Sequence, residues 1–192
     1  MIKKCRVCRA AFAPANTLQR VCSPACGLAY AKASREKAER KRARQKLAAD
    51  REKLKTVTDY RKEAQTAFNR YIQVRDSGLP CISCGITTGQ MHAGHYRTRA
   101  AAPQLAFNTY NVHRQCAQCN NSKSGNVVEY RKGLIRRIGA ETVERIEYDN
   151  SSAEHTIDYL KRIKAIFAKR ARHTTNLRER ARIRHLASVK EF

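Results

Sequence analysis

Hydrophobic and polar positions divide the middle of the chain into two helical stretches of different character. Residues 28 to 77 contain no Gly or Pro and are dominated by Ala, Lys, Arg, Glu and Gln, which favours one long helix or two in series. The first stretch, to about Leu54, has few large apolar side chains and is predicted to be solvated. The second carries an apolar stripe that is predicted to pack on the rest of the chain or on a second subunit: Val57, Tyr60, Ala64, Ala67, Tyr71 and Val74.

The same periodicity predicts three further helices towards the C-terminus. Residues 127 to 138 have helical spacing that ends at Gly139, and residues 141 to 146 predict a short second helix. Ser151 and Glu154 have the spacing of a capping box, which predicts the start of a third helix. The apolar face of that helix would consist of Ile157, Leu160, Ile163 and Phe167. The chain is therefore predicted to be mostly helical.

The charge of the chain indicates a polyanionic partner. Lys and Arg outnumber Asp and Glu by 40 to 16 in 192 residues, and nucleic acid is the leading candidate for such a net charge of +24. Residues 31 to 78 hold 15 basic and 7 acidic side chains, so this segment is either a solvated charged helix or, as the excess favours, an arm that contacts nucleic acid. Residues 161 to 190 hold 11 basic and one acidic side chain, in a helical or disordered tail expected to contact phosphates.

The sequence favours a cytoplasmic protein without membrane contacts. No stretch offers the roughly 18 consecutive apolar residues of a membrane span, and Trp, a common interfacial anchor, is absent. The first residues include two lysines but no apolar run of signal-peptide length. In a reducing compartment, the eight cysteines are expected to be metal ligands rather than disulfides.

The cysteines form two quartets with the close pairs typical of zinc sites. Ser23 and Pro24 are expected to open a helix within the first quartet, while Phe12 and Leu18 supply a tiny core that should unfold without zinc. Four thiolates leave no open coordination position, so both zinc ions are predicted to be structural. The first quartet is Cys5, Cys8, Cys22 and Cys26, and the second is Cys81, Cys84, Cys116 and Cys119.

The segment around the second quartet lacks acidic residues altogether. From Leu79 to Val128 there is no Asp or Glu, which excludes a two-metal carboxylate nuclease, a glycosidase-type acid pair or a P-loop ATPase built from this segment. The segment instead holds His92, His95 and His113. If it is catalytic, its base must be an imidazole and its metal ligands must be neutral.

The central motifs resemble a known class of nuclease. The order His95, Asn111 and Asn120 around the cysteine pairs resembles the zinc-ribboned HNH nucleases of ββα-metal architecture, and Asn in the last position resembles the branch-cleaving phage endonuclease VII type. Over nearly its whole length the chain resembles the NinG (Rap) family of recombination endonucleases of lambdoid phages. The motifs of this second resemblance are C-x-x-C with C-S-P-x-C, H-A-G-H-Y, Q-C-x-x-C-N and S-G-N-V-V-E-Y.

The resemblance implies roles for four residues. His95 would be the general base that activates water, Asn120 would ligate a single Mg²⁺ or Mn²⁺, and Asn111 would fasten the loop behind the base. Many HNH sites place a metal ligand immediately before the base, but Gly94 stands there in this chain. His92 is the candidate for that ligand if the strand kinks at residues 93 and 94.

Each of these residues also has a purely structural interpretation. His95 could be a hydrogen-bonded structural histidine, and Asn111 and Asn120 could be turn and cap residues. For His113, a structural or phosphate-contacting role is the better interpretation. In a segment without acids, four basic side chains are expected to favour DNA phosphates: Arg97, Arg99, Arg114 and Lys123.

The resemblance implies an α+β, mostly helical fold. A zinc-bound ββα-metal module, HNH-like and of treble-clef type, would stand beside a separate zinc finger and long basic helices. The expected parts are an N-terminal four-cysteine finger at 1–30, a basic helical arm with a possible dimerisation stripe at 31–78, the nuclease module at 79–150, and a basic helix and tail at 151–192.

The implied activity is metal-dependent cleavage of branched recombination intermediates such as Holliday junctions and D-loops. Symmetric cleavage of a junction favours a homodimer, with the apolar stripe as its face, and phage or host recombination proteins as further partners. The implied location is the cytoplasm of an infected or lysogenic bacterial host. The alternatives are a non-catalytic zinc protein that binds DNA or RNA, and an RNA-associated accessory factor, although the latter leaves the His-Asn-Asn order unexplained.

Overall fold

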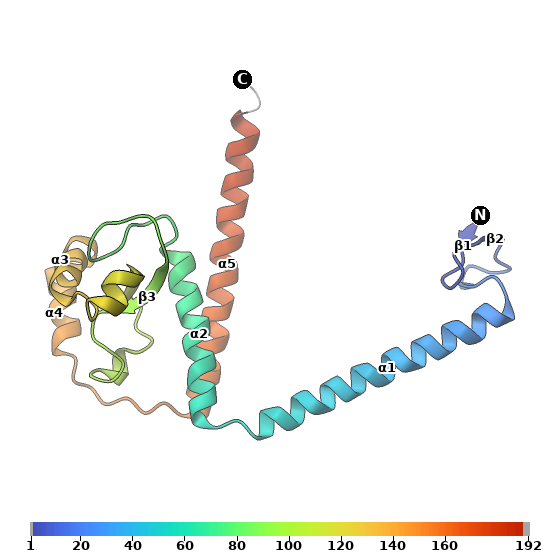
Figure 1. Ribbon diagram of the computed structural model, residues 1–192, viewed down its shortest axis with the longest axis horizontal. Helices are drawn as coiled ribbons and strands as arrows, with labels where there is room; N and C mark the ends of the chain where they lie inside the picture. Colours follow the sequence, from blue (N-terminus) through green and yellow to red (C-terminus); the bar gives the residue numbers. More distant parts are fainter. Residues whose placement is uncertain (1, 190–192) are drawn as a thin grey trace. The chain divides into compact units, whose positions relative to one another are not determined.

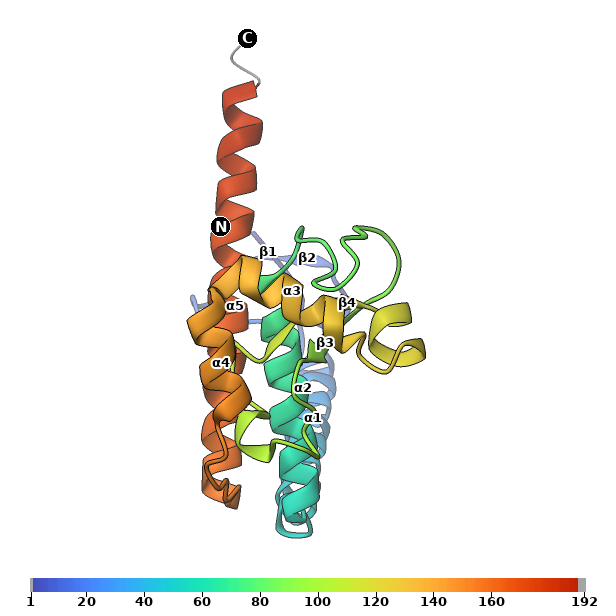
Figure 2. The ribbon, with the colours of Figure 1, turned by 90° about the vertical axis from the view of Figure 1, so that its left-hand side faces the viewer.

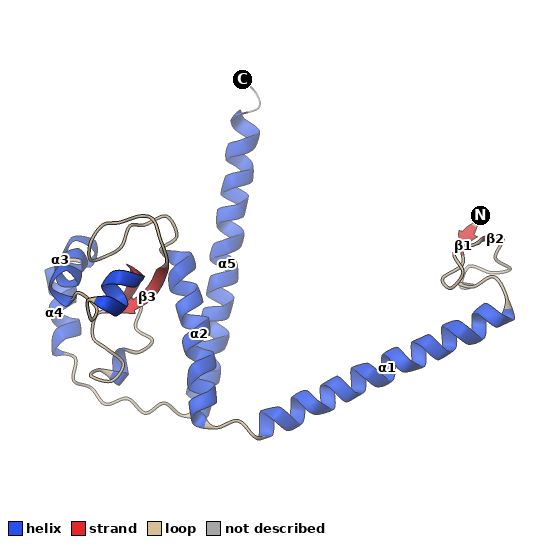
Figure 3. Ribbon diagram, in the orientation of Figure 1, coloured by secondary structure: helices blue, strands red, loops and turns tan. Residues whose placement is uncertain are grey.

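The computed structural model describes the backbone of residues 2–189 and the side chains up to residue 182. The described chain is mostly helical, with two small antiparallel sheets of two strands each (Figures 1 and 3). It divides into two compact units, one ending at Lys55 and the other beginning at Thr56. The mostly helical α+β class is confirmed. None of the described helices is long and apolar enough to cross a membrane.

The first unit consists of a small cysteine-containing finger followed by a long helix. Strands β1 (Lys3–Lys4) and β2 (Ala11–Phe12) pair, and α1 spans Pro24–Lys53. Ser23 caps α1 by accepting a hydrogen bond from the Cys26 amide, so the predicted helix start is confirmed.

Almost nothing in this unit is buried. Its helix α1 buries no residue, and Cys5 is the one buried side chain among the described residues up to Lys55. The prediction that Leu18 belongs to a small core is wrong, because its side chain is 81% exposed. Phe12, the other residue expected in this core, is only partly buried. The finger therefore has no apolar core apart from its cysteines.

A second helix begins directly after the first one ends. Helix α2 spans Val57–Arg75, and Thr56 and Asp59 form a reciprocal capping box at its start. Of the two predicted alternatives, one long helix or two in series, the structure has two helices. The expected division placed residues 31 to 78 in one arm, but the structure assigns α2 to the second unit, where it packs against the elements that follow.

The second unit places a hairpin beside α2 and follows it with three helices (Figure 2). Strands β3 and β4 are joined by a loop with one 3-10 turn, η1 (Pro103–Leu105), and β4 leads into a π-helical turn, η2. The remaining bounds are β3 Met91–His95, β4 Val112–Cys116, η2 Gln118–Ser122, α3 Val127–Ile138, α4 Ala140–Tyr148 and α5 Ile157–Val189. The predicted helix that ends at Gly139 and the short helix after it are confirmed.

The apolar stripe of α2 packs within its own chain. Helices α2 and α5 run side by side in the same direction, with Lys164 paired to Glu63 near their starts at 2.8 Å (Figure 1). The stripe therefore packs within the chain, which is one of the two predicted alternatives, while Val57 at its start is 41% exposed. The buried residues of this core are Tyr60, Ala64, Phe68 and Ile72 of α2, Leu160 and Phe167 of α5, and Ala106, Phe107 and Val112 of the hairpin region.

A second core holds α3 and α4 against the hairpin and its loop. Tyr130 and Leu134 are fully buried there, together with Ile82 beside the central cysteines. At Gly133, a Cβ atom would lie 2.0 Å from the backbone oxygen of Ile82. Only glycine allows α3 to approach the cysteine turn this closely, so α3 and the central cysteine cluster form one packed body.

Helix α5 begins later than its sequence suggests. Thr156 caps it by accepting a hydrogen bond from the Tyr159 amide at 3.2 Å, whereas Ser151 binds the carboxylate of Asp149. The predicted start at Ser151 is wrong because packing on α2 begins only at Ile157. The C-terminal run is helical to Val189, and residue 190 lies outside the described residues.

Candidate functional site

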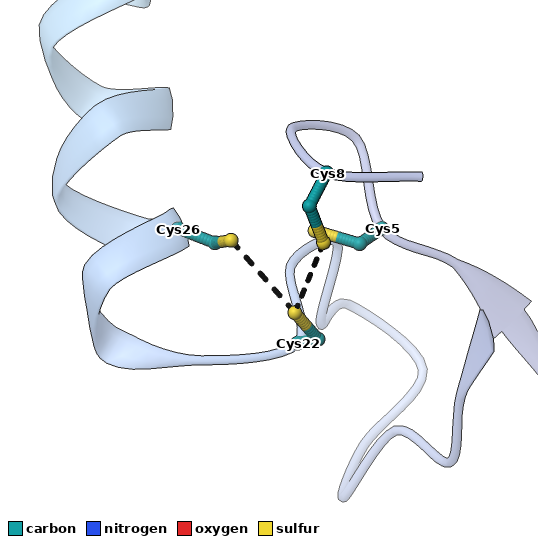
Figure 4. A group of neighbouring side chains, drawn as sticks. All are labelled: Cys5, Cys8, Cys22 and Cys26. Atoms are coloured by element: carbon teal, nitrogen blue, oxygen red, sulfur yellow. Dashed lines mark hydrogen bonds between the residues drawn. The ribbon is translucent and has the colours of Figure 1, made fainter. Parts of the chain in front are cut away.

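Each cysteine quartet comes together, as predicted, with all four sulfurs within 4.8 Å of one another. In the finger, Cys5 and Cys8 lie in the turn after β1, Cys22 precedes α1, and Cys26 lies in its first turn (Figure 4). The Cys22 Sγ lies 3.5 Å from that of Cys8 and 3.8 Å from that of Cys26. The second quartet joins the turn before β3 to the end of β4 and the start of η2: Cys81, Cys84, Cys116 and Cys119.

The chemistry of these donors fits a cation. Backbone amides of Cys116 and Cys119 donate to sulfur at 3.3 and 3.4 Å, an arrangement that favours thiolates. Burial and neighbouring thiols nevertheless raise the pKa of Cys119 to about 12, because crowded sulfurs cannot all ionise without a positive charge between them. A tetrahedral zinc ion supplies that charge and accepts four sulfurs, so both clusters could hold zinc.

The strands of the central hairpin pair without a bulge. The register runs unbroken from Met91 opposite Cys116 to His95 opposite Val112. The kink that was expected at residues 93 and 94 is absent, but His92 and His95 still line the same cavity, which is described below.

Gln115 on β4 explains why residue 94 is a glycine. A Cβ atom at Gly94 would lie 2.2 Å from Oε1 of Gln115, a fully buried side chain. The Gln115 amide donates to Ser83 and to the carbonyl of Gly125, which fixes it in this space. The position that a side chain before His95 would occupy is therefore filled from the partner strand.

A cavity of about 750 Å³ brings together three of the four residues predicted to be catalytic. His92 and His95 enter from β3 and Asn120 from η2, while Asn111 does not line it. Helix α2 contributes Asn69 and Gln73, which the sequence analysis missed because they belong to no motif and reach the cavity only through the packing of α2. No Asp or Glu is found among the described residues that line this cavity.

One ring nitrogen of His95 is hydrogen-bonded to a backbone carbonyl. Its Nε2 lies 3.1 Å from the backbone oxygen of Ala106, which can only accept, so Nε2 carries the proton and Nδ1 keeps its lone pair. Burial lowers the pKa of His95 below its ordinary value, the Ala106 carbonyl opposes this effect, and the positive charge of Arg99 lowers it further. The imidazole is therefore neutral and able to accept a proton near neutral pH.

Asn111 ties together the loop that follows His95. Its fully buried amide accepts a hydrogen bond from the Arg97 backbone and donates to the carbonyls of Arg97 and Leu105 at 2.9 and 3.2 Å. These bonds join Arg97 to Leu105, the residue directly before Ala106. Asn111 thus positions the carbonyl that fixes His95.

The side chains of Asn120 and His92 each have an atom that is available to bind a cation. The Nδ2 of Asn120 donates to Asn121 at 2.7 Å, which leaves the Asn120 Oδ1 as its remaining acceptor. Nε2 of His92 is buried and has no hydrogen-bond partner among the described residues. Both side chains are neutral ligands, as expected of a segment without carboxylates.

A buried acidic residue outside the predicted segment supports the hairpin. Asp76, at the end of α2, is 3% exposed and accepts hydrogen bonds from Arg75 at 2.7 Å and from the Arg114 backbone at 2.9 Å. Burial alone would raise its pKa, but the neighbouring His113 side chain and the hydrogen-bonded Arg75 guanidinium outweigh burial and hold the pKa of Asp76 well below its ordinary value. Buried His113 contacts this cluster, which is a structural role.

The four side chains predicted to contact phosphates differ in their surroundings. Arg97 donates to the carbonyls of Ile146, Glu147 and Asp149, so its guanidinium caps α4. Arg99 is exposed and lines the cavity. Lys123 is exposed after η2, and Arg114 is partly buried on β4.

The fold and the two clusters define a mostly helical α+β protein with two four-cysteine clusters that could bind metal. Residues 1–179 match the protein family described as "Bacteriophage Lambda NinG protein". The chain therefore belongs to the NinG family of bacteriophage proteins. Within the part of the chain that the structure describes, the family match spans both cysteine clusters and the cavity.

The relatives are similar over almost their whole length. Protein ninG of Escherichia phage lambda is 45% identical over 190 residues, which cover 91% of this chain and 93% of that protein. Protein ninG of Salmonella phage P22 is 43% identical over 190 residues, with the same coverage. Protein ninG of Escherichia phage 933W is 42% identical over 194 residues, covering 93% of this chain and 96% of that protein. No solved structure matches this chain.

Proposed function

We propose that the protein is an HNH-type, metal-dependent DNA endonuclease that cleaves branched recombination intermediates such as Holliday junctions and D-loops. The hairpin, η2 and α3 would be its ββα-metal module, with the central cysteine cluster as a structural zinc site of treble-clef type. The preference for branched DNA comes from the resemblance to the NinG (Rap) recombination endonucleases. Charge and site chemistry support nucleic acid as the substrate class.

The observation that carries this proposal is the state of His95 in its cavity. The hydrogen bond to Ala106 fixes the tautomer, and the lowered pKa keeps the ring neutral. Nδ1 would take a proton from water as the water oxygen bonds to phosphorus. The bond from phosphorus to the leaving sugar oxygen breaks, and that oxygen takes a proton from solvent. Asn111 acts only through the loop that it holds.

Asn120 and His92 are the proposed ligands of one Mg²⁺ or Mn²⁺. When bound, the metal ion stabilises negative charge on the phosphate and the leaving oxygen. Because Asn120 and His92 are uncharged, the substrate phosphate must supply the anionic oxygen. Tight metal binding is therefore expected only in the presence of DNA.

The basic and acid-free surroundings suit a phosphate substrate. Arg99 in the cavity wall and Lys123 after η2 would contact the DNA backbone. Helix α1 has no buried residue and carries 10 basic against 4 acidic side chains, so it would add non-specific affinity as an arm. Two subunits would allow symmetric cleavage of a junction, with phage or host recombination proteins as further partners in the bacterial cytoplasm.

The direct test compares cleavage of a labelled four-way junction and a linear duplex of the same sequence. Each is incubated with the full-length protein in Mg²⁺, in Mn²⁺ and in EDTA. We expect nicking of the junction that needs the divalent ion. Binding of either DNA without any metal-dependent nicking would contradict the enzyme proposal and favour the alternative, a non-catalytic zinc protein that binds nucleic acid.

A further inference from the structure

Helix α2 lines two hollows, one on each side of Gln73. The first is the cavity that contains His95, where Asn69 and Gln73 form part of the wall. The second, of about 410 Å³, lies between the end of α2 and α5 and is lined by Gln73, Val74, Ser77, Thr175, Arg178, Glu179 and Arg182. Gln73 is exposed and common to both, so the two hollows meet at its side chain.

The α2 side chains in the first hollow are neutral amides. Asn69 accepts a hydrogen bond at its Oδ1 from the Gln65 side chain at 2.8 Å, and Gln65 is 7% exposed. This contact turns the two Nδ2 hydrogens of Asn69 away from Gln65. A neutral donor in a cavity without carboxylates suits a phosphate oxygen.

The second hollow is positively charged and its geometry is fixed. Arg178 donates to the carbonyls of Ser77 and Arg75 at 3.0 and 3.1 Å, which holds α5 against the end of α2. Arg182 is exposed one turn further along α5, and its ion pair with Glu179 spans 4.0 Å with 73% of the arginine side chain accessible.

We infer that the two hollows form one continuous path for a DNA backbone, leading from the cavity of His95 across Gln73 to Arg178 and Arg182 on α5. This inference rests on the proposed function, because it assigns the path to the strand whose phosphate enters that cavity. Helix α2 is then a DNA-contacting wall as well as a core helix. A DNA arm that leaves the cavity in this direction would contact Arg178 and Arg182 on α5. A shorter duplex would not reach this surface.

The test measures binding of a labelled four-way junction and uses the full-length protein with His95→Ala, so that cleavage does not intervene. Gln73→Glu puts a carboxylate where the hollows meet without changing side-chain size, and about tenfold weaker binding is expected from repulsion of phosphate. Arg182→Gln should reduce the slope of log affinity against log salt by about 0.9, the loss of one phosphate contact. With a duplex that is truncated on the side of the cavity facing α5, Arg182→Gln should no longer change the salt slope. Gln73→Glu should still weaken binding of that duplex.

Two matched variants control for net charge. Asn150→Asp adds one negative charge and Lys132→Gln removes one positive charge at exposed positions that line neither hollow. Both should bind the junction like the parent. If Gln73→Glu weakens binding and Arg182→Gln leaves the salt slope unchanged, the path ends at the cavity and the inference is wrong. It is also wrong if the control variants weaken binding as much. Neither result depends on whether the wild-type protein cleaves DNA.

Discussion

The N-terminal and central cysteine clusters gather the same four ligands in different surroundings. In the finger, Cys5 is the one buried side chain among the described residues up to Lys55, and Leu18 is exposed. Around the central cluster, α3 packs on the Ile82 backbone at Gly133, and Asp76 holds β4 from the other side. The finger depends on its metal for a core, whereas the central cluster and its hairpin are also supported by α3 and by Asp76.

This difference bears on where chemistry can be carried out. A catalytic histidine must be held in one orientation, and His95 has a buried carbonyl, a fixed loop and a packed helix around it. No described residue of the finger has comparable support. The site proposed for catalysis therefore lies in the unit that has an apolar core.

Removal of zinc should unfold the finger but not the α2–α5 core, and this is the largest difference expected between the two regions. Structural zinc in small fingers contributes about 10 kcal/mol or more to folding, so a chelator should abolish hydrogen-exchange protection at residues 3 to 22. Amides of α2 should retain theirs, because the α2–α5 core contains no metal ligand. Hydrogen exchange followed by mass spectrometry measures both regions in one sample. Equal loss of protection in both would contradict the comparison, as would fewer than about two zinc ions per chain by elemental analysis.

Asp76→Asn should destabilise the second unit alone. The substitution leaves Arg75 and Arg137 near a neutral side chain in a buried cluster, at a cost of about 3 kcal/mol in the free energy of unfolding. Because the folded-state pKa of Asp76 is depressed, its contribution is present above about pH 4 and is lost as the pH falls further. Urea denaturation at pH 7 and pH 3 tests both statements. A variant that loses as much stability at pH 3 as at pH 7 would show that the charge of Asp76 is unimportant.

The pH dependence of cleavage should report the environment of His95. Its ordinary pKa is about 6.5 and the folded value is lower, so the neutral base persists below pH 6.5. The single-turnover rate should stay level down to that pH and then fall about tenfold per pH unit below the depressed pKa. A rate that already falls about tenfold per unit between pH 8 and pH 7 would contradict a depressed pKa at the base.

Substitution of Arg97 should change stability and substitution of Arg99 should change DNA binding, and both effects should be small. Arg97→Ala removes the cap on α4 and should cost about 1 kcal/mol of stability. Arg99→Ala should leave stability unchanged and reduce the salt slope of DNA binding by about 0.9. Thermal unfolding and binding titrations on both variants separate the roles. The reverse pattern would show that the two assignments are exchanged.

The sequence was most informative where local signals decide the outcome. The cysteine spacing predicted both clusters, and Gly139 marked the end of α3. Helix α5 was misjudged at Ser151 because a capping signal competes with the need to bury Ile157 on α2, and that contact is not local. A helix start next to an apolar face is set by packing as much as by its cap.

Long-range contacts were the part that the sequence could not supply. The acid-free segment was visible, but Asp76 precedes it and reaches Arg114 only because α2 packs beside β4. Asn69 and Gln73 enter the cavity in the same way. The space at Gly94 was recognised as missing a ligand, yet its occupant, Gln115, lies 21 positions away on the paired strand.

The central claim is that His95 acts as the base of a metal-dependent nuclease. The most direct measurement is the single-turnover rate of junction cleavage in Mn²⁺ by His95→Ala, beside His173→Ala as an exposed histidine on α5 outside the cavity. Loss of a general base is expected to slow cleavage by at least about a hundredfold with junction binding retained, while His173→Ala cleaves like the wild type. Undiminished cleavage by His95→Ala would contradict the account.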